Sequence, residues 1–444
     1  MMVLSSKSVN DWRFLGKHPA FPSGKSYYEM IRFVGYPGEE VIIKGSDVVS
    51  GWEKYRGNIY VVDWRYNSQQ VFCDGEILQQ IGGKLKHWSS SYWLGKKGNR
   101  IEDMEPGSFY YDIKKKKLYV WLKDNSDPNN HLIEASVRPC IFYLGKLDYI
   151  ELSNLKMMHS NSTSFQLGAA LGLGGCHNII IDNVSVTYAD YIGIYFSGSN
   201  ITVTNSKFNW CGNSGMGARG WGHRIINCET SHNNYRNFFT GWHAGGVKIV
   251  PFAHDVVMSG HISTYNKGVG VWFDIGCSNV TIRNSLIHHN EGNGIFYEIS
   301  EHGVIKNNIV YENKGTGIVI GDGSDNLIAN NLVYKNGSGI RISALFLNRG
   351  SWGETFGGEE YNYPWVRNNR IWGNIIMDNG IRYDKNAKMP YDMILPPSSS
   401  WPAAYNNISD YNLFWKSDGK EIKIATGVLR QGALLYKKVY NLKQ

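Results

Sequence analysis

The sequence predicts an all-β fold in which short strands stack turn upon turn, a β-solenoid. The stretch Gly270-Val-Trp-Phe-Asp-Ile returns one repeat later as Gly294-Ile-Phe-Tyr-Glu-Ile, and the same frame continues at Gly317 and Gly339. The steps between these four glycines are 24, 23 and 22. A self-similar period in the twenties, carried by β-rich segments, is the sequence signature of a solenoid.

Asparagine recurs in two columns of the same period. Members of the first column precede a strand-opening Gly by ten residues, and they are Asn183, Asn205, Asn284 and Asn307. Members of the second column advance in steps of 24, 23 and 23, and they are Asn266, Asn290, Asn313 and Asn336. Amide side chains stacked at a turn can hydrogen-bond to the turns above and below. We therefore interpret both columns as structural ladders.

The composition fits a turn-rich β protein and argues against binding to nucleic acid. The 444 residues include 50 Gly, the aromatic content is 14%, and the net charge of +8 comes from scattered residues. Exposed aromatic rings beside polar groups suit carbohydrate, whose C–H faces stack on them. The one dense basic run, Lys114–Lys117, lies between two strand-like segments, where a hairpin tip is expected. We expect no nucleic-acid partner.

Cysteine usage and hydropathy argue against further classes of protein. The six Cys form no CxxC pair and show no metal-ligand spacing, which predicts reduced thiols in the core or in turns. We expect no cofactor, and Asp322 and Asp325 could either hold a metal ion or belong to a plain turn. No stretch reaches the roughly 18 apolar residues of a membrane span, so no membrane partner is expected. The first residues, Met1–Lys7, lack the apolar core of a signal peptide. We expect a cytoplasmic protein, unless the chain is a secreted protein that has lost its leader.

The repeat divides the chain into four parts. Residues 1–50 supply the first strands of the solenoid, and residues 51–134 abandon the repeat for alternating strands and turns. Asp74-Gly75 in the second part is a strong hairpin signal, so we expect a small antiparallel β domain inserted there. The solenoid resumes over residues 135–380, and residues 381–444 form a C-terminal cap and tail.

Two loops are longer than the repeat permits. Ser231–Gly245 stretches one step of the repeat to 31, and Leu345–Arg367 is a larger insertion rich in aromatic and acidic residues. Long loops that leave a regular scaffold often carry function. Both are therefore candidates to border a site.

The candidate site lies on the strands that open at Gly270 and Gly294. Side chains alternate along a strand, so Val271, Phe273 and Ile275 should point into the core. Trp272 and Asp274 should then face solvent.

The same alternation makes Phe296 and Glu298 face outward, and Lys248 in the turn before. Equivalent positions of successive turns stack about 4.8 Å apart, which places Asp274 beside Glu298. Two carboxylates so close repel each other, which raises one pKa and prepares an acid and a nucleophile. Retaining glycosidases hold their carboxyls about 5–5.5 Å apart and inverting enzymes about 6.5–9.5 Å. The spacing therefore predicts retention.

Simpler interpretations stay open for these residues. The two acids could hold Ca²⁺ or be a tolerated surface pair, although Trp272 and Phe296 beside them favour a sugar over a bare ion. His243, which follows Trp242, could donate to a sugar hydroxyl or could stabilise its own loop.

Three segments resemble the β-xylosidases of glycoside hydrolase family 120. They are residues 268–300 with the two outward acids, residues 242–248 (WHAGGVK), and residues 69–83 with the Asp-Gly turn. The resemblance implies a right-handed parallel β-helix interrupted by a β-sandwich-like domain. It also implies cleavage of xylo-oligosaccharides with retention.

The resemblance also implies residue roles. Asp274 would be the nucleophile and Glu298 the acid/base. A Trp from the inserted domain lines the sugar pocket of the family, and Trp88 or Trp93 could match it.

The leading hypothesis is therefore a retaining glycoside hydrolase that acts on short, pentose-type oligosaccharides such as those from xylan. A polysaccharide lyase or uronate epimerase is the first alternative, with Lys248, Arg219 or Arg341 neutralising an acidic sugar. A non-catalytic glycan-binding solenoid is the second. The expected partner is an oligosaccharide, and a homo-oligomer is possible.

Overall fold

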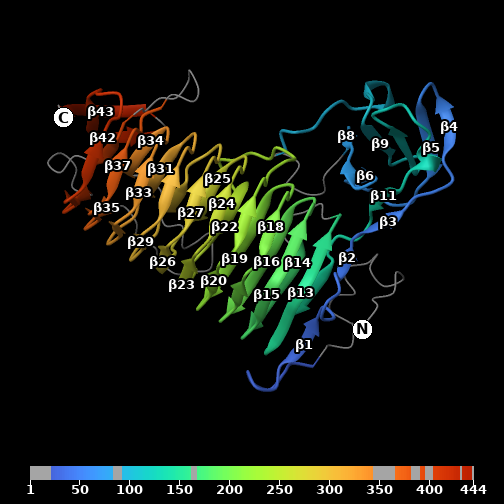
Figure 1. Ribbon diagram of the computed structural model, residues 1–444, viewed down its shortest axis with the longest axis horizontal. Coiled ribbons are helices and arrows are strands. Elements are labelled where there is room, and N and C mark those ends of the chain that lie inside the picture. Colours follow the sequence, from blue (N-terminus) through green and yellow to red (C-terminus); the bar gives the residue numbers. More distant parts are fainter. Residues whose placement is uncertain are drawn as a thin grey trace.

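The computed structural model shows a right-handed parallel β-helix with smaller sheets at one end (Figure 1). It describes residues 22–83, 93–161, 168–343, 366–381, 391–395, 404–430 and 433–442. Side chains are not described for residues 404–405, 425–430 and 433–442. Trp88 and residues 345–365 of the second long loop lie outside the described residues.

Each full turn of the coil contributes one strand to each of three faces. The first face runs through β12 (Phe142–Gly145), β14 (Ala169–His177), β16 (Ile192–Ser199), β19 (Ser214–Trp221), β22 (Gly245–Ile249), β25 (Val269–Phe273), β28 (Ile295–Glu298), β31 (Thr316–Gly321), β34 (Ser338–Ser343), β38 (Met393–Leu395) and β42 (Ile422–Arg430). All neighbours along this face are parallel. β43 (Ala433–Leu442) then pairs antiparallel with β42.

The second and third faces follow the same order. The second consists of β1 (Ile31–Val34), β13 (Ile150–Met158), β15 (Ile180–Thr187), β17 (Thr202–Thr204), β20 (Arg224–Ile226), β23 (His254–Ser259), β26 (Ser278–Arg283), β29 (Val304–Lys306), β32 (Leu327–Ala329), β36 (Arg370–Trp372) and β40 (Ile408–Asp410). The third, into which β13 and β15 extend, consists of β2 (Ile42–Lys44), β18 (Lys207–Asn209), β21 (Glu229–Ser231), β24 (Ile262–Thr264), β27 (Leu286–His288), β30 (Ile309–Tyr311), β33 (Leu332–Tyr334), β37 (Ile375–Met377) and β41 (Leu413–Trp415). A separate pair joins β35 (Val366–Arg367) to β39 (Ala404–Tyr405).

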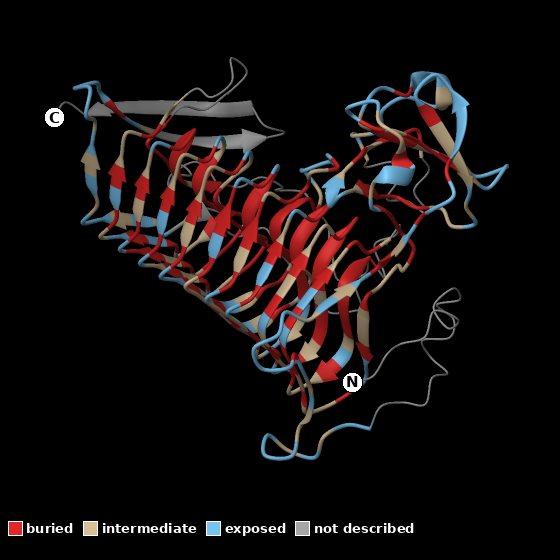
Figure 2. Cartoon of the chain, turned by 45° about the vertical axis from the view of Figure 1, so that its right-hand side comes forward, coloured by how far each residue is buried: buried red, intermediate tan, exposed pale blue. Residues whose placement is uncertain are grey.

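The predicted alternation along the strands is confirmed for the core, which fills the coil (Figure 2). Val271 and Phe273 of β25 point inward and are fully buried, as are Ile295 and Tyr297 of β28. Ile275 was expected to do the same, and that prediction is wrong. It lies beyond the end of β25 with φ of 48° and is only half-buried, because the chain turns a corner there.

The second asparagine column is a continuous buried amide ladder, as predicted. The side-chain amide of Asn266 donates to Asn290 at 2.8 Å, Asn290 to Asn313 at 2.9 Å, and Asn313 to Asn336 at 2.9 Å. Asn336 continues the ladder to Asn379 at 3.0 Å.

The first asparagine column has a different cause. Its members have φ between 49° and 57°, and they are Asn183, Asn205, Asn284 and Asn307. Asn tolerates this left-handed conformation better than most residues. The column therefore marks the corner of each turn, where Asn183 also donates its side-chain amide to Asn154 of the turn before at 2.8 Å.

Replacing Asn290 by Ala should lower the free energy of unfolding by about 3 kcal/mol, because several buried backbone and amide groups lose their partner. Its Oδ1 accepts from Asn266, and its amide donates to Ser263 O and Asn313 Oδ1. Urea denaturation measures the difference. Asn284→Gly is the control and should be nearly neutral, since glycine adopts positive φ freely. Equal losses in both variants would contradict the ladder's role.

Two small sheets and their own hydrophobic core occupy the segment between β2 and β12. One sheet orders β4 (Glu53–Arg56), β5 (Ile59–Asp63), β10 (Lys117–Trp121), β9 (Ser108–Asp112) and β8 (Gln79–Ile81). The other orders β3 (Ser46–Val48), β11 (Ile133–Ser136), β6 (Val71–Cys73) and β7 (Glu76–Ile77). Short 3-10 turns lie at Ile101–Asp103 and Pro128–Asn130. Only the β8–β9 pair is parallel among these described strands.

Both hairpin predictions in this segment are confirmed. Asp74 and Gly75 join β6 to β7 with φ of 50° and 86°, positive values that a tight two-residue hairpin turn requires. The basic run Lys114–Lys117 closes the hairpin between β9 and β10. The division of the chain into four parts stays a prediction.

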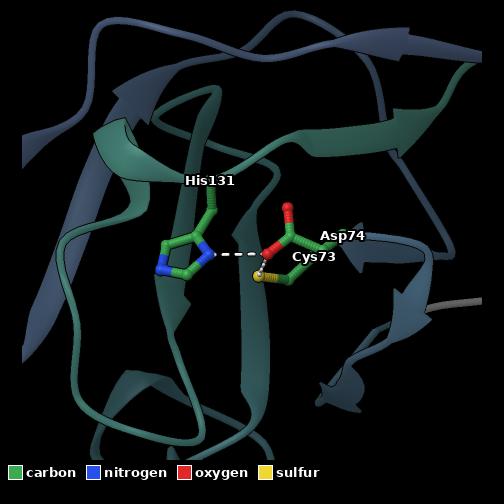
Figure 3. A group of neighbouring side chains, drawn as sticks. All are labelled: Cys73, Asp74 and His131. Atoms are coloured by element: carbon green, nitrogen blue, oxygen red, sulfur yellow. Dashed lines mark hydrogen bonds and ion pairs between the residues drawn. The ribbon is translucent and has the colours of Figure 1, made fainter.

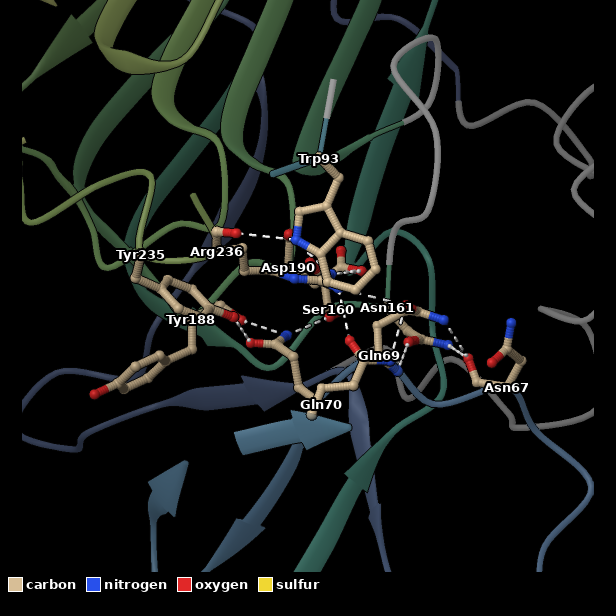
Figure 4. Close-up of polar contacts among 11 residues, drawn as sticks. Asn67, Gln69, Gln70, Trp93, Ser160, Asn161, Tyr188, Asp190, Tyr235 and Arg236 are labelled. Carbon is tan, nitrogen blue, oxygen red and sulfur yellow. Dashed lines mark hydrogen bonds and ion pairs between the residues drawn. The ribbon is translucent and has the colours of Figure 1, made fainter. Parts of the chain in front are cut away.

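The first long loop, Ser231–Gly245, ties these sheets to the coil (Figure 4). Tyr235 donates to Gln70 Oε1 at 2.6 Å, and Gln70 donates to the coil carbonyl of Ser160 at 2.7 Å. Arg236 reaches Gln80 at 2.8 Å and the buried carboxylate of Asp190 at 3.4 Å. At least part of this loop therefore has a structural role.

No helix within the described ranges combines the length and the apolar character needed to cross a membrane.

Candidate active site

The register of the first face brings one column of side chains together. Lys248 of β22 pairs with Trp272 of β25, and Trp272 pairs with Phe296 of β28. The column continues to Val319 of β31 and Arg341 of β34. Since the residues on either side of each position point into the core, these side chains lie on the outer side of the face.

The two candidate acids lie at the ends of adjacent strands. Phe273 pairs with Tyr297, so Asp274, the next residue, falls one rung before Glu298. Neighbouring strands are about 4.8 Å apart. The predicted juxtaposition of the two acids on one face of the coil therefore agrees with the register.

The expectation that these side chains face solvent is wrong, although they do project from the coil. Trp272 is 5% exposed, Phe296 8%, Lys248 3%, and Asp274 and Glu298 7% each. They cover one another, because the rings of Trp272 and Phe296 stack at 5.2 Å and Lys248 Nζ lies 3.0 Å from the centre of the Trp272 ring. The acids are thus held in a largely dehydrated setting.

Lys248 forms a buried ion pair with Asp274. Its Nζ lies 2.6 Å from Asp274 Oδ2, and the backbone N–H of Ile275 donates to Asp274 Oδ1 at 2.8 Å. Burial lowers the pKa of Lys248, while the charges of Asp274 and Glu298 oppose that change. Lys248 therefore offsets part of the repulsion that two adjacent carboxylates would otherwise feel.

Glu298 has a different environment. The indole N–H of Trp272 donates to Glu298 Oε2 at 3.1 Å, so one oxygen is held by a neutral donor. Asp274 by contrast is bonded directly to a cation. Two acids with unlike partners are the usual basis for dividing acid and nucleophile roles.

The two diagonal contacts, Lys248 to Asp274 and Trp272 to Glu298, were missed by sequence reasoning. Each contact joins a residue to the side chain that lies two positions beyond its register partner on the next strand. The sequence did contain the information needed. Alternation along each strand identifies the outward side chains, and the repeat spacing identifies which of them are neighbours on adjacent turns.

His243 is buried, and its Nδ1 bonds to Asn213 Oδ1 at 2.9 Å. Burial, with the nearby charge of Lys248, lowers the pKa of His243 to about 3, so the ring is neutral at pH 7. The half-buried Trp242 ring lies 5.3 Å from it. The contact with Asn213 favours the loop-stabilising interpretation of His243 over a sugar contact through Nδ1.

Trp93 contacts the first long loop and not the two acids. Its indole N–H donates to Arg236 O at 2.9 Å, and it packs near Phe238 and Ala244. It also lines a cavity of about 1310 Å³ between the small sheets and the coil, a cavity whose lining includes neither acid. This cavity is separate from the candidate active site.

Cys73, Asp74 and His131 form a group on the small sheets that could in principle hold a metal ion (Figure 3). His131 Nδ1 lies 2.7 Å from Asp74 Oδ2, and the backbone N–H of Leu132 donates to Asp74 Oδ1 at 2.9 Å. Burial and nearby acids raise the pKa of Cys73 to about 11, which keeps the thiol protonated. These bonds tie the β6–β7 turn to the start of β11, so the group has a structural explanation.

A family model described as a right-handed β-helix region matches residues 169–333, less than half of the chain. No curated protein matches the chain. The solved structure of XylC in complex with xylose is 17% identical, with a TM-score of 0.65, and the match covers 91% of this chain and 80% of that one.

Two further similar structures have lower scores. The periplasmic alginate epimerase AlgG is 16% identical, with a TM-score of 0.48 and coverage of 63% of this chain and 62% of that one. The A-module of the Azotobacter vinelandii mannuronan C-5 epimerase AlgE4 is 14% identical, with a TM-score of 0.49 and coverage of 68% of this chain and 80% of that one. The likeness to XylC shows the shared fold.

Proposed function

We propose that this protein is a retaining glycoside hydrolase that releases xylose-type pentoses from short oligosaccharides, with Asp274 as the nucleophile and Glu298 as the acid/base. One observation carries the proposal. Two dehydrated carboxylates lie one rung apart on the same face, one held by a cation and the other by an indole N–H. A separation near one strand spacing, about 4.8 Å, suits the retaining arrangement and leaves little room for a water between them.

In the first step, Glu298 gives its proton to the oxygen that links the sugar to the leaving group. Asp274 attacks the anomeric carbon, the carbon–oxygen bond to the leaving group breaks, and a glycosyl ester forms on Asp274. Lys248 suits this step because its hydrogen bond of 2.6 Å to Asp274 Oδ2 positions the attacking carboxylate.

In the second step, Glu298 removes a proton from water, which attacks the anomeric carbon and releases Asp274. Ester formation removes the negative charge of Asp274. A negative charge on Glu298 then no longer meets repulsion from Asp274. The same residue can thereby change from acid to base.

The aromatic pair supports a sugar as the substrate. The rings of Trp272 and Phe296 stack beside the acids, and the C–H faces of sugars pack on such rings. The likeness in fold to XylC, solved with xylose, supports a pentose by analogy of fold alone.

Removing the side chain of Glu298 should leave an enzyme that azide can rescue. With an aryl xyloside whose leaving group needs no protonation, Glu298→Ala should still form the glycosyl ester but hydrolyse it slowly. Azide, which needs no base, should then restore turnover and give a glycosyl azide. The measurement is turnover with and without azide, with product analysis by mass spectrometry.

Asp274→Ala is the matched variant and should not give a glycosyl azide of retained configuration. If azide gave a glycosyl azide of retained configuration with Asp274→Ala and not with Glu298→Ala, the assigned roles would be reversed. A wild-type protein that binds oligosaccharides and never releases a sugar would instead support a glycan-binding solenoid.

A uronate lyase or epimerase is the second candidate, favoured by one observation. Burial lowers the pKa of Lys248, which is a property required of a lysine that acts as a base. Incubation with uronate polymers distinguishes the candidates, because a lyase gives unsaturated products that absorb ultraviolet light and an epimerase changes the uronate ratio without cleavage.

A further inference from the structure

Two buried polar groups on β34 lie near the candidate active site. The Nε of Arg341 and the Oγ of Ser343 are buried and have no hydrogen-bond partner among the described residues. Ile340 and Ile342 are fully buried in the core. Since side chains alternate along a strand, Arg341 and Ser343 both project from the outer side of the first face.

The register places these two residues relative to the acids. Glu298 pairs with Gly321, and Gly321 pairs with Ser343, so Ser343 lies two rungs beyond Glu298 in the same column. Phe296 pairs with Val319, and Val319 pairs with Arg341, so Arg341 lies in the adjacent column. Because Gly321 has no side chain, no side chain of this column lies between Glu298 and Ser343 at that rung.

The guanidinium of Arg341 is a cation close to Glu298. Burial lowers the pKa of Arg341 to about 10, against the opposing effect of the Glu298 charge, and Arg341 is therefore charged at neutral pH. Arg341 as a whole is half-buried, although its Nε is buried.

Unpartnered buried donors are unfavourable, because they lose their bonds to water and gain none in exchange. A guanidinium N–H and a hydroxyl two residues apart on one side of a strand can both donate to the oxygens of one carboxylate. The geometry of a carboxylate matches such a charged, planar donor.

We propose that Arg341 and Ser343 form a subsite for the carboxylate of a uronic acid residue in the substrate. The proposal rests on the hydrolase function above and names its substrate class. Asp274, Glu298 and Ser343 follow one another along the coil axis. The acid/base faces the leaving group, so the uronic acid is the leaving sugar, lying over Gly321. The two rungs between Glu298 and Ser343 span about 10 Å, room for one sugar unit with its carboxylate at the far end.

The test compares two disaccharides that differ only in the carboxylate, xylosyl-glucuronic acid and xylosyl-glucose. Wild type should show a kcat/KM for the acidic disaccharide at least ten times that for the neutral one. In Arg341→Gln this ratio should fall toward one, and in Ser343→Ala it should fall several-fold. Arg283→Gln, an exposed arginine on the second face, should keep the wild-type ratio.

A wild-type ratio near one, or a ratio that Arg341→Gln does not change, would overturn the subsite. If Arg341→Gln does not fold, as judged by circular dichroism and thermal melting, Ser343→Ala decides in the same way. Binding of glucuronate against glucose, measured by calorimetry on wild type and Ser343→Ala, gives a readout that needs no hydrolysis. If neither disaccharide nor an aryl xyloside is cleaved while glucuronate still binds, the hydrolase function fails and the carboxylate subsite stands.

Discussion

Asp274→Asn should lower kcat on an aryl xyloside by a factor on the order of 10⁴ or more, as loss of a member of a covalent catalytic set does elsewhere. The amide is nearly isosteric with the carboxylate, and its oxygen can still accept from Lys248, which now lies 2.6 Å from the carboxylate. What it lacks is the charge needed to attack the anomeric carbon. Steady-state hydrolysis at saturating substrate measures the loss.

Asp63→Asn is the matched control, because Asp63 also forms an ion pair with a lysine, Lys117, at 2.8 Å. That pair is exposed on the small sheets, with Asp63 at 85% and Lys117 at 38%. This variant should hydrolyse the xyloside at the wild-type rate. If Asp274→Asn did the same, Asp274 would not be the nucleophile.

Lys248→Met should lower the free energy of unfolding by about 3–5 kcal/mol, because it leaves the Asp274 charge buried and uncompensated. Lys248 is 3% exposed and Asp274 7%, so water cannot replace the lost partner. Denaturation in urea measures the effect. Lys117→Met breaks the exposed pair with Asp63 and should change stability far less.

The double variant Lys248→Met with Asp274→Asn separates the charge from the packing. Removing both charges should recover much of the stability lost in Lys248→Met, since the amide carries no charge to compensate. Additive losses from the two substitutions would contradict an energetic coupling between Lys248 and Asp274.

Much of the coil could be predicted from the sequence because its structure is periodic. The spacing of Gly270, Gly294, Gly317 and Gly339 gives the stacking of β25, β28, β31 and β34, and parity along each strand gives the inward side chains. The same rule placed Asp274 beside Glu298. Periodicity fails where the chain leaves the strand, as at Ile275, whose positive φ at the corner ends the alternation.

Burial of the outer side chains could not be predicted in this way. Alternation along a strand predicts the side of the sheet on which a side chain lies. It does not predict which other side chains cover that side. Trp272 and Phe296 are buried because large rings on adjacent rungs cover each other and Lys248. The asparagine columns show a similar limit. Asn recurs with the period of the repeat in both, but the second column is a buried amide ladder and the first marks corners with positive φ.

Contacts between the small sheets and the coil were the hardest to predict. Trp93 lies against the first long loop, where Arg236 joins it to Asp190 and Gln80. These residues are far apart in the chain, and neither the repeat nor local turn chemistry relates their positions. The resemblance that suggested Trp93 for the sugar pocket carried no information on this packing.

The configuration of the first product tests the central claim most directly. Proton NMR recorded during early hydrolysis of a β-xyloside distinguishes the two anomers of the released sugar before they interconvert. If Asp274 and Glu298 act one rung apart as nucleophile and acid/base, the β-anomer appears first. First appearance of the α-anomer, or release of an unsaturated sugar, would contradict the double displacement and with it the assigned roles of the two acids.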